Sequence, residues 1–293
     1  MYIRKTAVPI LLAAIIALAP LSSAASASKV IHRKVERENV TSGVTLDKIT
    51  MYTVDGWIKA NVLTVDLTDP NVKVDVLCDS GSVINLSTTL DLARNEGAVA
   101  AVNAGFFEWD REPGGSGRGY YYGTLVKSGQ VVMASNSTRS DLATLTISRL
   151  NEIIYDYLKT EMYLMTSWGQ KLPVSQYNRR RWDSAKSAWD YSGLTVLDRK
   201  WGNTSIGASQ NYPNLAEMVV KNGRVVEIRV GKPAVTIPGN GYVVVTNGSG
   251  VQTLQKYFAV GDYVDFIIST KPAWQNAKIS EYSRKVTGKP AKC

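Results

Sequence analysis

Hairpin-turn dipeptides constrain the fold of this chain more than any other sequence feature. They lie between β-prone runs at Asp55-Gly56, Ser128-Gly129 and Asn222-Gly223. Asn-Gly and Asp-Gly favour two-residue hairpin turns, because these residues tolerate the positive φ angles that such turns require. The chain shows no internal repeat and no coiled-coil heptads. The pattern predicts an α+β fold with a large mixed, mainly antiparallel β-sheet and a few helices.

The other elements are placed from their apolar spacing. Helices are expected at Leu86–Glu96, which Gly97 would end, and at Gly250–Tyr257. Leu142–Leu150 has the pattern of a strand, and a helix over Ser148–Lys159 is the alternative. The other expected strands are Ile49–Val54, Trp57–Leu67, Val72–Cys78, Ala98–Asn103, Thr124–Met133 with its turn, Glu217–Val220, Arg224–Val230, Gly241–Thr246 and Asp262–Thr270.

The uncharged run Ala98–Val102 predicts a strand that is buried on both faces. It ends in Asn103-Ala104-Gly105, residues that stop a strand and permit unusual backbone angles. Two aromatic residues and the polar, Gly-rich loop Glu108–Gly119 follow. A rigid strand that brings an amide, two rings and several charges to one place is typical of a binding site. The alternative is a core strand with an ordinary surface loop.

The segment Ala101–Phe107 reads Ala-Val-Asn-Ala-Gly-Phe-Phe, and Tyr122–Val132 follows it after a loop. Together they resemble the first motif of the phosphodiester glycosidase family, and the resemblance extends over Ile49–Thr270. The family includes the lysosomal uncovering enzyme, which removes N-acetylglucosamine from a phosphodiester. Its bacterial members are exported and are associated with exopolysaccharide or the cell wall. The resemblance therefore implies a hydrolase that cleaves the glycosidic bond of sugar 1-phosphodiesters in such material.

The resemblance also implies what the site must contain. Cleavage between the anomeric carbon and oxygen needs a cation for the phosphate, a carboxylate that stabilises the oxocarbenium-like centre or activates water, and donors for the sugar hydroxyls. By position, the candidate carboxylates are Glu108, Asp110 and Glu112, and the first two are assigned the catalytic role. The candidate substrate-binding residues are Asn103, Gly105, Phe106, Phe107, Arg111 and Arg118. The alternative is an exposed loop whose charges compensate one another.

The histidine and cysteine content excludes several catalytic classes. The one histidine is His32, which lies in a charged segment near the start of the chain. Ser-His-Asp and Cys-His mechanisms therefore lack their base, and a zinc site built on histidines is excluded. Cys78 and Cys293 are the two cysteines and form no metal-ligand cluster. We expect no metal site, and the sequence identifies no cofactor.

Residues 1–27 have the pattern of an export signal. Arg4 and Lys5 precede the apolar run Ala7–Leu21, and Ala25-Ser26-Ala27 fits a small-x-small cleavage site. The run is too short for a confident membrane span. We expect a secreted or cell-wall-associated protein cleaved near Ala27, with no stable membrane span afterwards. The alternative is a retained anchor.

The charge of the chain indicates its class of partner. The formal charge is +9, and removal of Arg4 and Lys5 leaves 9 − 2 = +7. Outside the cytoplasm a basic surface favours an anionic cell-wall glycan or a carbohydrate phosphodiester, and nucleic acid is not expected there. The alternative is that these charges are solvated and serve solubility. A non-catalytic module that binds anionic glycan is the second functional class.

The expected domain plan follows the resemblance. A polar lead-in covers residues 28–45, the phosphodiester-glycosidase-like domain covers 46–272, and a basic irregular tail covers 273–293. The family's late Asp-Gly-Gly-Gly-Ser motif has no counterpart in this sequence. The resemblance is therefore to the N-terminal part of the family, and we predict weak or no turnover.

The region 162–202 is expected to be the least regular part of the domain. It contains the basic cluster Asn178-Arg179-Arg180-Arg181-Trp182. Guanidinium groups match phosphate geometry, so this cluster is either a phosphate clamp or a solvated loop. Tyr177-Asn178 and Asp198–Gly202 are interpreted as structural insertions rather than chemistry.

Overall fold

The chain forms two compact units. The computed structural model describes residues 29–111, 117–136, 144–148, 150–272 and 282–286. The first unit contains the chain up to Val40 together with Val44–Val65, and the second contains Thr41–Gly43 and the chain from Asp66 onward. The expected export signal, residues 1–27, lies outside the described residues. No helix within the described ranges has the length and apolar character that crossing a membrane requires.

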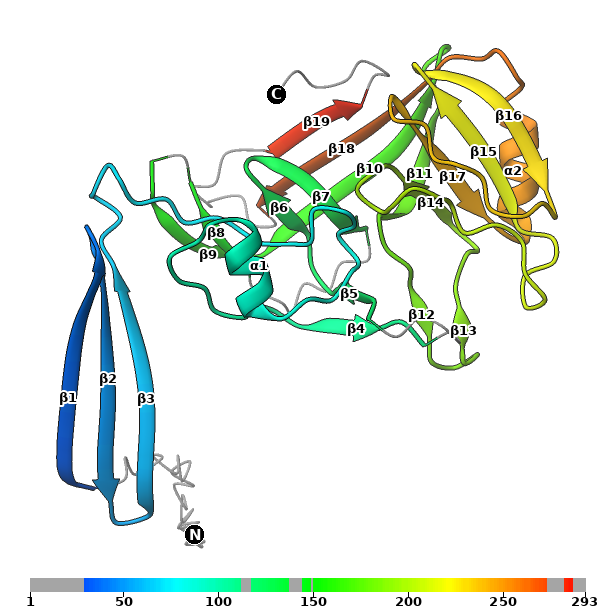
Figure 1. The fold of residues 1–293 in the computed structure, drawn as a ribbon. Coiled ribbons are helices and arrows are strands. Elements are labelled where there is room, and N and C mark those ends of the chain that lie inside the picture. Colours follow the sequence, from blue (N-terminus) through cyan, green and yellow to red (C-terminus); the bar gives the residue numbers. More distant parts are fainter. Residues whose placement is uncertain (1–28, 112–116, 137–143, 149, 273–281, 287–293) are drawn as a thin grey trace, which may run out of the picture. The chain divides into compact units, whose positions relative to one another are not determined.

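The first unit is a three-stranded sheet with the order β1-β2-β3 (Figure 1). Its strands are β1 (Val30–Thr41), β2 (Val44–Thr53) and β3 (Gly56–Val65). The expected hairpin is confirmed, with its turn at Val54-Asp55, one residue earlier than the sequence indicates. The segment 28–45, expected to be a polar lead-in, contains β1 and the start of β2, and its charged side chains form ion pairs across the sheet. Examples are Arg37 with Asp47 at 2.7 Å and Lys48 with Glu38 at 2.9 Å.

The second unit is built on a ten-stranded sheet (Figure 1). The strand order is β16-β15-β17-β14-β11-β10-β18-β19, and β7 pairs with β11 and β6 beside this path. Among the described strands, every pairing in this sheet is antiparallel except that of β11 with β14. The strands are β6 (Leu125–Lys127), β7 (Gln130–Ser135), β10 (Leu158–Thr166), β11 (Lys171–Tyr177), β14 (Leu194–Leu197), β15 (Ala216–Lys221), β16 (Arg224–Val230), β17 (Gly241–Thr246), β18 (Val264–Pro272) and β19 (Tyr282–Val286).

Three two-stranded sheets complete the described strands. They pair β4 (Phe107–Trp109) with β5 (Gly119–Tyr121), β8 (Thr144–Ile147) with β9 (Ile153–Asp156), and β12 (Trp182–Asp183) with β13 (Ala188–Trp189). The helices in the described ranges are α1 (Thr89–Asn95) and α2 (Ser249–Tyr257). The prediction of a large, mainly antiparallel sheet with few helices is confirmed, and α+β describes it only approximately because both helices are short.

The hairpins expected at Ser128-Gly129 and Asn222-Gly223 are both confirmed. The first joins β6 to β7, and the second joins β15 to β16. All four turn residues have positive φ, from 49° at Ser128 to 75° at Gly129. The strand expected at Gly241–Thr246 is β17, and the helix expected at Gly250–Tyr257 is α2 with one further residue. Local turn chemistry and valine-rich runs therefore predict these elements well.

Strand β17 lies at the centre of the hydrophobic core. Tyr242 and Val244 belong to one buried cluster, which also contains Leu254 of α2. Val243 and Val245 belong to a second buried cluster on the other face of the strand. Alternate side chains of a strand point to opposite faces of the sheet. The second cluster contains aromatic side chains that border the site described below, namely Tyr120, Trp189, Tyr191 and Trp201.

The prediction of a buried central strand at Ala98–Asn103 is wrong. This segment belongs to none of the described strands, and Val102 is 79% exposed. Its first backbone N–H, that of Ala98, donates to the carbonyl of Ala93 as the chain leaves α1. Much of the run is alanine, which has low strand propensity and buries little apolar area. The valine-rich strand β17, which lies between β15 and β14, contributes to both buried clusters instead.

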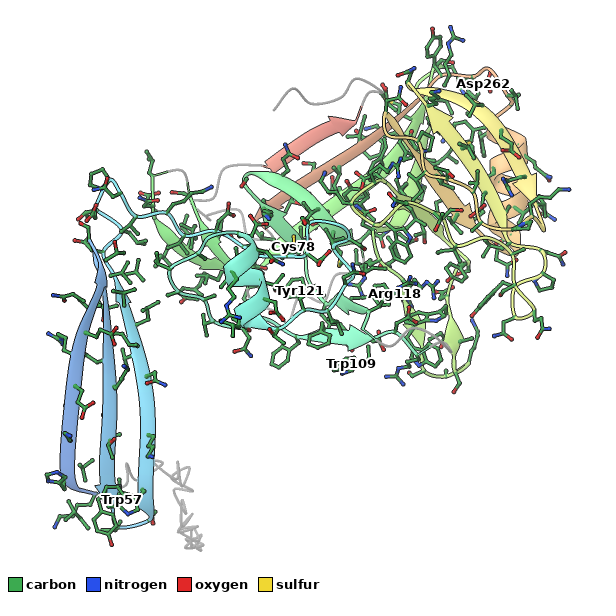
Figure 2. All side chains as sticks on the ribbon, viewed as in Figure 1. Trp57, Cys78, Trp109, Arg118, Tyr121 and Asp262 are labelled. Atoms are coloured by element: carbon green, nitrogen blue, oxygen red, sulfur yellow. The ribbon has the colours of Figure 1, made fainter. Side chains whose placement is uncertain are left out.

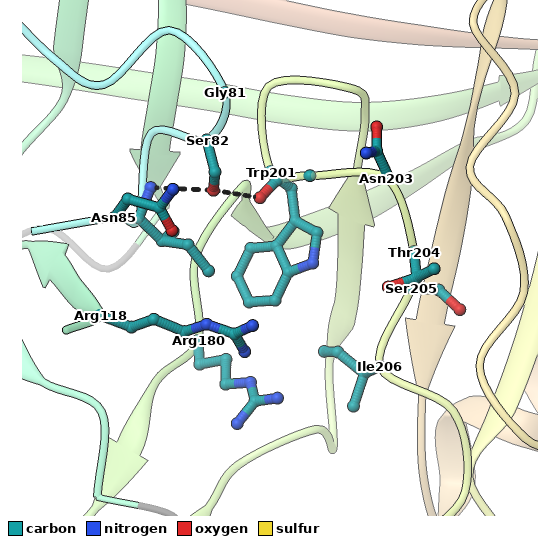
Figure 3. Close-up of a pocket in the computed structure, with 12 residues that line it drawn as sticks. Gly81, Ser82, Asn85, Arg118, Arg180, Trp201, Asn203, Thr204, Ser205 and Ile206 are labelled. Atoms are coloured by element: carbon teal, nitrogen blue, oxygen red, sulfur yellow. Dashed lines mark hydrogen bonds between the residues drawn. The ribbon is translucent and has the colours of Figure 1, made fainter. Parts of the chain in front are cut away.

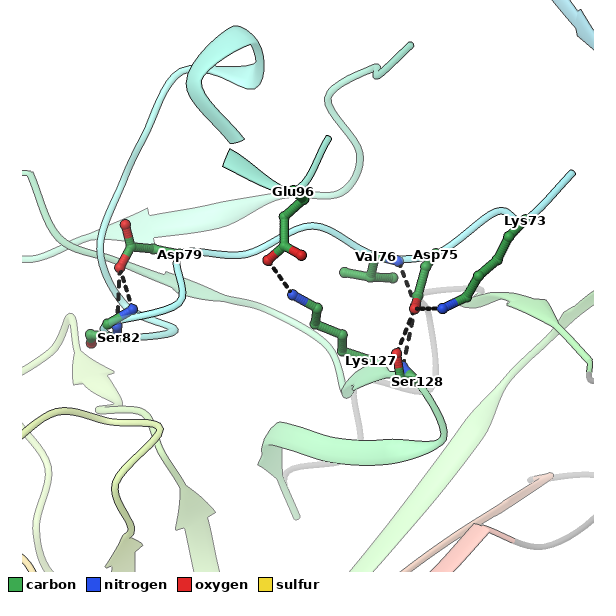
Figure 4. Close-up of polar contacts among 9 residues, drawn as sticks. Lys73, Asp75, Val76, Asp79, Ser82, Glu96, Lys127 and Ser128 are labelled. Carbon is green, nitrogen blue, oxygen red and sulfur yellow. Dashed lines mark hydrogen bonds and ion pairs between the residues drawn. The ribbon is translucent and has the colours of Figure 1, made fainter. Parts of the chain in front are cut away.

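The prediction of a strand at Val72–Cys78 is also wrong. This stretch is held by carboxylates rather than by a strand ladder (Figure 4). Asp75 accepts hydrogen bonds from the backbone N–H and hydroxyl of Ser128, at 3.2 and 2.6 Å. Asp79 accepts from the N–H of Ser82 at 3.1 Å, which closes a turn just before the candidate site. Aspartate side chains that bond nearby backbone groups compete with strand pairing.

Three further expectations change. The region 162–202 is regular, since it contains most of β10 and all of β11, β12, β13 and β14. The strand expected at Leu142–Leu150 is confirmed as the shorter β8, and the alternative helix over Ser148–Lys159 is wrong because β9 and the start of β10 lie there. In the expected irregular tail, Tyr282–Val286 forms β19, which pairs with β18.

Candidate functional site

Two loops that follow neighbouring parallel strands form the centre of the candidate site. Strands β11 and β14 are parallel, with Tyr177 opposite Val196. Because the carboxyl ends of parallel strands meet at the same edge of a sheet, residues 178–182 after β11 lie beside residues 198–202 after β14. The parallel direction of the two strands therefore places the basic cluster 178–182 next to residues 198–202, which the sequence interpretation takes as a structural insertion.

A buried polar network joins these two loops. The amide nitrogen of Asn178 donates to the carbonyl of Val132 at 3.0 Å and to Asp198 Oδ1 at 2.8 Å. The amide oxygen of Asn178 accepts from the backbone N–H of Asp198 at 2.9 Å. Tyr177 donates its hydroxyl to the other Asp198 oxygen at 2.7 Å. Asn178 is fully buried at a φ of 52°, a left-handed conformation that asparagine tolerates better than most residues. The network holds the start of the arginine cluster in place.

Arg180 lies among aromatic rings and is only 7% exposed. Its Nη1 is 3.7 Å from Asp110 Oδ2, which also accepts from the hydroxyl of Tyr120 at 2.8 Å. The guanidinium lies over the rings of Trp189 and Trp201, at 5.5 and 5.7 Å from their centroids. Burial raises the pKa of Tyr120, so its hydroxyl stays protonated and remains a donor to Asp110. These contacts fix the Arg180 guanidinium at one position.

Arg179 is also buried, and its hydrogen bonds give it a structural role. Its Nη1 donates to the carbonyls of Tyr121 and Tyr122, at 2.8 and 3.2 Å. Burial lowers the pKa of Arg179 to about 10, and the charge of Glu108 opposes this shift. Glu108 Oε1 is also 3.3 Å from Arg111 Nη2. Arg179 is therefore still a cation at neutral pH and ties the loop to the segment after β5.

A cavity of about 290 Å³ opens beside Arg180 (Figure 3). Arg118 and Arg180 provide two guanidinium groups, and the Trp201 ring lies near them. No carboxylate is among the described residues that line it. The lining residues are Gly81, Ser82, Ile84, Asn85, Arg118, Arg180, Trp201, Gly202, Asn203, Thr204, Ser205 and Ile206. Its volume is near the lower end for small-ligand sites, and its charge suits an anion.

One wall of the cavity is a short segment that bridges two distant parts of the chain. The hydroxyl of Ser82 donates to the carbonyl of Trp201. Asn85 forms an isolated antiparallel bridge with Arg118. These contacts place the Asn85 amide and the Arg118 guanidinium on the same side of the cavity (Figure 3). The wall therefore depends on residues separated by more than a hundred positions in the chain.

The opposite wall, residues 202–206, is supported from behind by Glu217. The Glu217 carboxylate accepts from the N–H of Gly207 at 2.9 Å and lies 3.7 Å from Arg229 Nε. Burial raises the pKa of Glu217, and the hydrogen bonds from Ser205 and Gly207 oppose this shift. Ser205 also lines the cavity. The position of this wall therefore depends on its hydrogen bonds to the buried Glu217 carboxylate.

Of the predicted site residues in the described ranges, one lines the cavity and a second contacts a residue that lines it. Arg118 lines it directly. Asp110 has a side chain only 1% exposed and contacts Arg180, which lines the cavity. Glu108 is buried, and Arg111 is paired with it. Neither carboxylate lines the cavity, and both stay predictions as catalytic residues; Glu112 lies outside the described residues.

The other predicted substrate-binding residues lie away from the cavity lining. Asn103 and Phe106 are exposed, and Phe107 is partly exposed on β4. Gly105, at a φ of 70°, lies against the ring of Tyr121, where an added Cβ would come within 2.2 Å of that ring. The glycine of the motif therefore allows close packing of this loop.

The sequence interpretation missed part of the site. Ser82, Asn85 and Trp201 were not predicted as site residues. The basic cluster 178–182 is the sequence signal that points to this site. Of its two interpretations, a phosphate clamp fits the burial of Arg179 and Arg180 better than a solvated loop does. No local pattern marks Asn85, because only the bridge to Arg118 brings it to the cavity.

Comparisons with known proteins support the fold alone. No family model matches the chain, and no curated protein does. A hypothetical protein from Synechocystis matches with a TM-score of 0.63 and 19% identity over 82% of this chain and 41% of its own length. The "Putative exported protein" from Burkholderia pseudomallei K96243 matches with a TM-score of 0.66 and 17% identity over 88% of this chain and 72% of its own. The chain thus spans less than half of the first of these structures.

Proposed function

We propose that this protein is an exported phosphodiester glycosidase-like hydrolase that binds the phosphate of a sugar 1-phosphodiester between Arg118 and Arg180. The observation that carries the proposal is the convergence of these two guanidinium groups, from distant segments, on one cavity. Guanidinium groups bind phosphate oxygens with matched geometry and strong charge-assisted hydrogen bonds. The resemblance of Ala101–Phe107 to the family's first motif supplies the sugar and the reaction.

The rest of the cavity suits the sugar part of such a ligand. Asn85, Asn203 and Thr204 provide amide and hydroxyl groups for sugar hydroxyls, and Trp201 provides an aromatic wall. Asp110 holds Arg180 from behind and is the carboxylate of the predicted pair with a contact to a cavity residue. Action outside the cytoplasm is supported by the signal pattern of residues 1–27 and by the name of the Burkholderia protein.

The test measures binding and turnover separately on the purified full chain. We expect N-acetylglucosamine 1-phosphate to bind, whereas free N-acetylglucosamine binds much more weakly. Arg118→Ala removes hydrogen bonds to a charged group and should weaken phosphate binding by about tenfold to a hundredfold. The matched control is Arg224→Ala, which removes an arginine that lies over Tyr263 and does not line the cavity. Equal affinity of Arg118→Ala and the parent protein would contradict the proposal.

A second function, binding without catalysis, is favoured by one observation. No carboxylate is among the described residues lining the cavity. Release of free sugar from a UDP-N-acetylglucosamine-type substrate distinguishes the two functions. Turnover that Asp110→Asn abolishes, with phosphate binding retained, supports the hydrolase. Binding with no turnover by the parent chain supports a module that recognises anionic cell-wall glycan.

A further inference from the structure

The outer edge of β3 is a candidate for pairing with another strand. The order β1-β2-β3 makes β1 and β3 the two edges of this sheet, and no strand that the structure describes pairs with the outer side of β3. An edge strand presents a row of backbone N–H and C=O groups that a further strand can bind. Trp57, the second residue of β3, lies at the turn end of this edge (Figure 2) and is 67% exposed.

The two edges of the sheet differ in charge. Charged side chains, lysine above all, protect an edge strand against pairing with another chain. In β3, the charged residue is Lys59, and the rest of the strand is neutral. The charged residues of β1 are Arg33, Lys34, Glu36, Arg37 and Glu38. The sequence therefore protects the β1 edge and leaves the β3 edge open to a partner.

Backbone direction decides which residues of β3 can pair at this edge. The N–H of Asp66 donates to the carbonyl of Gly43 at 2.7 Å, one position beyond the pair of Val44 with Val65. Hydrogen-bonded and non-hydrogen-bonded pairs alternate along an antiparallel ladder. The β3 residues whose N–H and C=O groups point away from β2 are therefore Trp57, Lys59, Asn61, Leu63 and Val65. In a ladder between two copies of β3, these residues must lie opposite one another.

One register of this kind makes β3 complementary to a second copy of itself. In an antiparallel pair centred on Ala60, Trp57 lies opposite the second copy's Leu63, and Ile58 lies opposite its Val62. Lys59 lies opposite the second copy's Asn61, whose amide oxygen can accept a hydrogen bond from the Lys59 ammonium. Apolar side chains thus meet apolar ones and polar side chains meet polar ones, and such cross-strand pairs stabilise a sheet.

The neighbouring registers fit less well. A pair centred on Lys59 places two ammonium groups directly opposite each other, which is destabilising. A pair centred on Asn61 places Lys59 opposite the second copy's Leu63. The register centred on Ala60 is therefore favoured, with the smallest side chain of the strand after glycine at the two-fold axis.

The pairing also extends an apolar face of the sheet. The register of β2 with β3 places Ile58 opposite Met51 and Ala60 opposite Ile49. Across the described strands β1 and β3, no residue is buried. A small sheet gains stability when further strands join a common apolar face. A second copy of β3 would continue this face across the edge.

We propose that β3 pairs antiparallel with β3 of a second copy of this chain, about a two-fold axis at Ala60. The first units of the two chains then form one six-stranded sheet. Because each β3 has one outer edge, an association of this symmetry closes at two copies. The proposal concerns the first unit and does not depend on the ligand of the cavity.

Cross-linking tests the register on the full chain with Cys78→Ser and Cys293→Ser. Ala60→Cys should form an intermolecular disulfide under mild oxidation, because two directly opposed residues of a non-hydrogen-bonded pair are close enough for one. Lys59→Cys and Asn61→Cys are the register controls, since each of these residues lies opposite a different residue of the second copy. Stronger cross-linking at either control position than at Ala60 would show that the register is wrong.

Sedimentation velocity tests the interface itself. The parent chain should form dimers that dissociate on dilution. Ile58→Lys and Val62→Glu should each weaken dimerisation by about tenfold, because each places a charge opposite an apolar side chain twice in the dimer. A mixture of the two variants should dimerise again, since the introduced ammonium of one then lies opposite the introduced carboxylate of the other. A mixture that stays monomeric would overturn the proposal.

Val35→Lys is the matched control at the protected edge. Arg37 pairs with Asp47 at 2.7 Å, and Asp47 lies opposite Val62. Because side chains alternate along a strand, Val35 shares the face of Val62, and it is 41% exposed. Val35→Lys should dimerise like the parent. If it weakens the dimer as much as Ile58→Lys does, the copies pack face to face and the edge pairing is wrong. A parent chain that is monomeric at every concentration also overturns the proposal.

Discussion

Two segments of this protein differ in burial in the opposite sense to what their sequences predict. The apolar stretch 98–106 is largely exposed, whereas Asn178, Arg179 and Arg180 are buried. The apolar stretch consists mostly of small side chains, which gain little from burial. The polar stretch is buried because Asp198 and backbone carbonyls accept hydrogen bonds from Asn178 and Arg179, and because Asp110 forms an ion pair with Arg180. Specific partners can therefore outweigh average hydrophobicity in deciding which segment lies inside.

Asn178→Ala should produce the largest effect among the variants that test this comparison. It removes three hydrogen bonds of the buried network and leaves Asp198 without its amide partner. We expect a loss of about 3 kcal/mol in the free energy of unfolding, measured in urea. Asn222→Ala is the matched control, because Asn222 has a φ of 53° but lies exposed in a turn. Similar losses for both variants would mean that backbone conformation, and not the network, sets the cost.

Gly119→Ala should have the next largest effect. The added methyl group meets the Phe107 ring, the Leu86 side chain and the Glu108 carbonyl. Overpacking of this kind costs about 1–3 kcal/mol, and thermal unfolding measures it. Gly239→Ala is the control, because an added Cβ at Gly239 meets no atom within 4 Å. A Gly119→Ala protein as stable as this control would show that β4 and its aromatic rings are free to move.

A smaller effect is expected from the pH dependence of Glu217. Because burial raises its pKa, the folded state binds the proton more tightly than the unfolded state does. The contribution of Glu217 to stability is therefore fully present below its ordinary pKa and is lost as the pH rises through the raised value. We expect the stability of the parent relative to Glu217→Gln to fall as the pH rises from the ordinary glutamate pKa, about 4, through the raised pKa of Glu217. A constant difference across this range contradicts the assignment.

Val102→Ser should produce almost no change. Val102 is 79% exposed, and surface substitutions usually change stability by less than about 0.5 kcal/mol. Val244→Ala, at a fully buried position of β17, should cost on the order of 2 kcal/mol. Urea denaturation of both variants compares the two positions directly. A loss at Val102 as large as that at Val244 would restore the central strand that the sequence predicts for this segment.

The sequence predicts those elements of the fold that depend on residues adjacent in the chain. Asn222-Gly223 and the valines of Gly241–Thr246 specify a turn and a strand through residues adjacent in the chain. The site depends on contacts between distant residues. Asp110 meets Arg180, and Asn85 meets Arg118, across 70 and 33 positions (180 − 110 and 118 − 85). Arg118 was predicted from its loop composition, but its partners could not be read from any local pattern.

The parallel pair of β11 and β14 has a kinetic consequence. The two strands are joined by a crossover that contains the β12–β13 hairpin, so they cannot associate through a tight turn. Pairings of this kind form slowly, because the entropy of closing the intervening loop is lost before the contacts form. Both loops of the cavity leave from the carboxyl ends of these strands. During refolding, the antiparallel hairpins should form first, and the ability to bind phosphate should return only in the slowest phase.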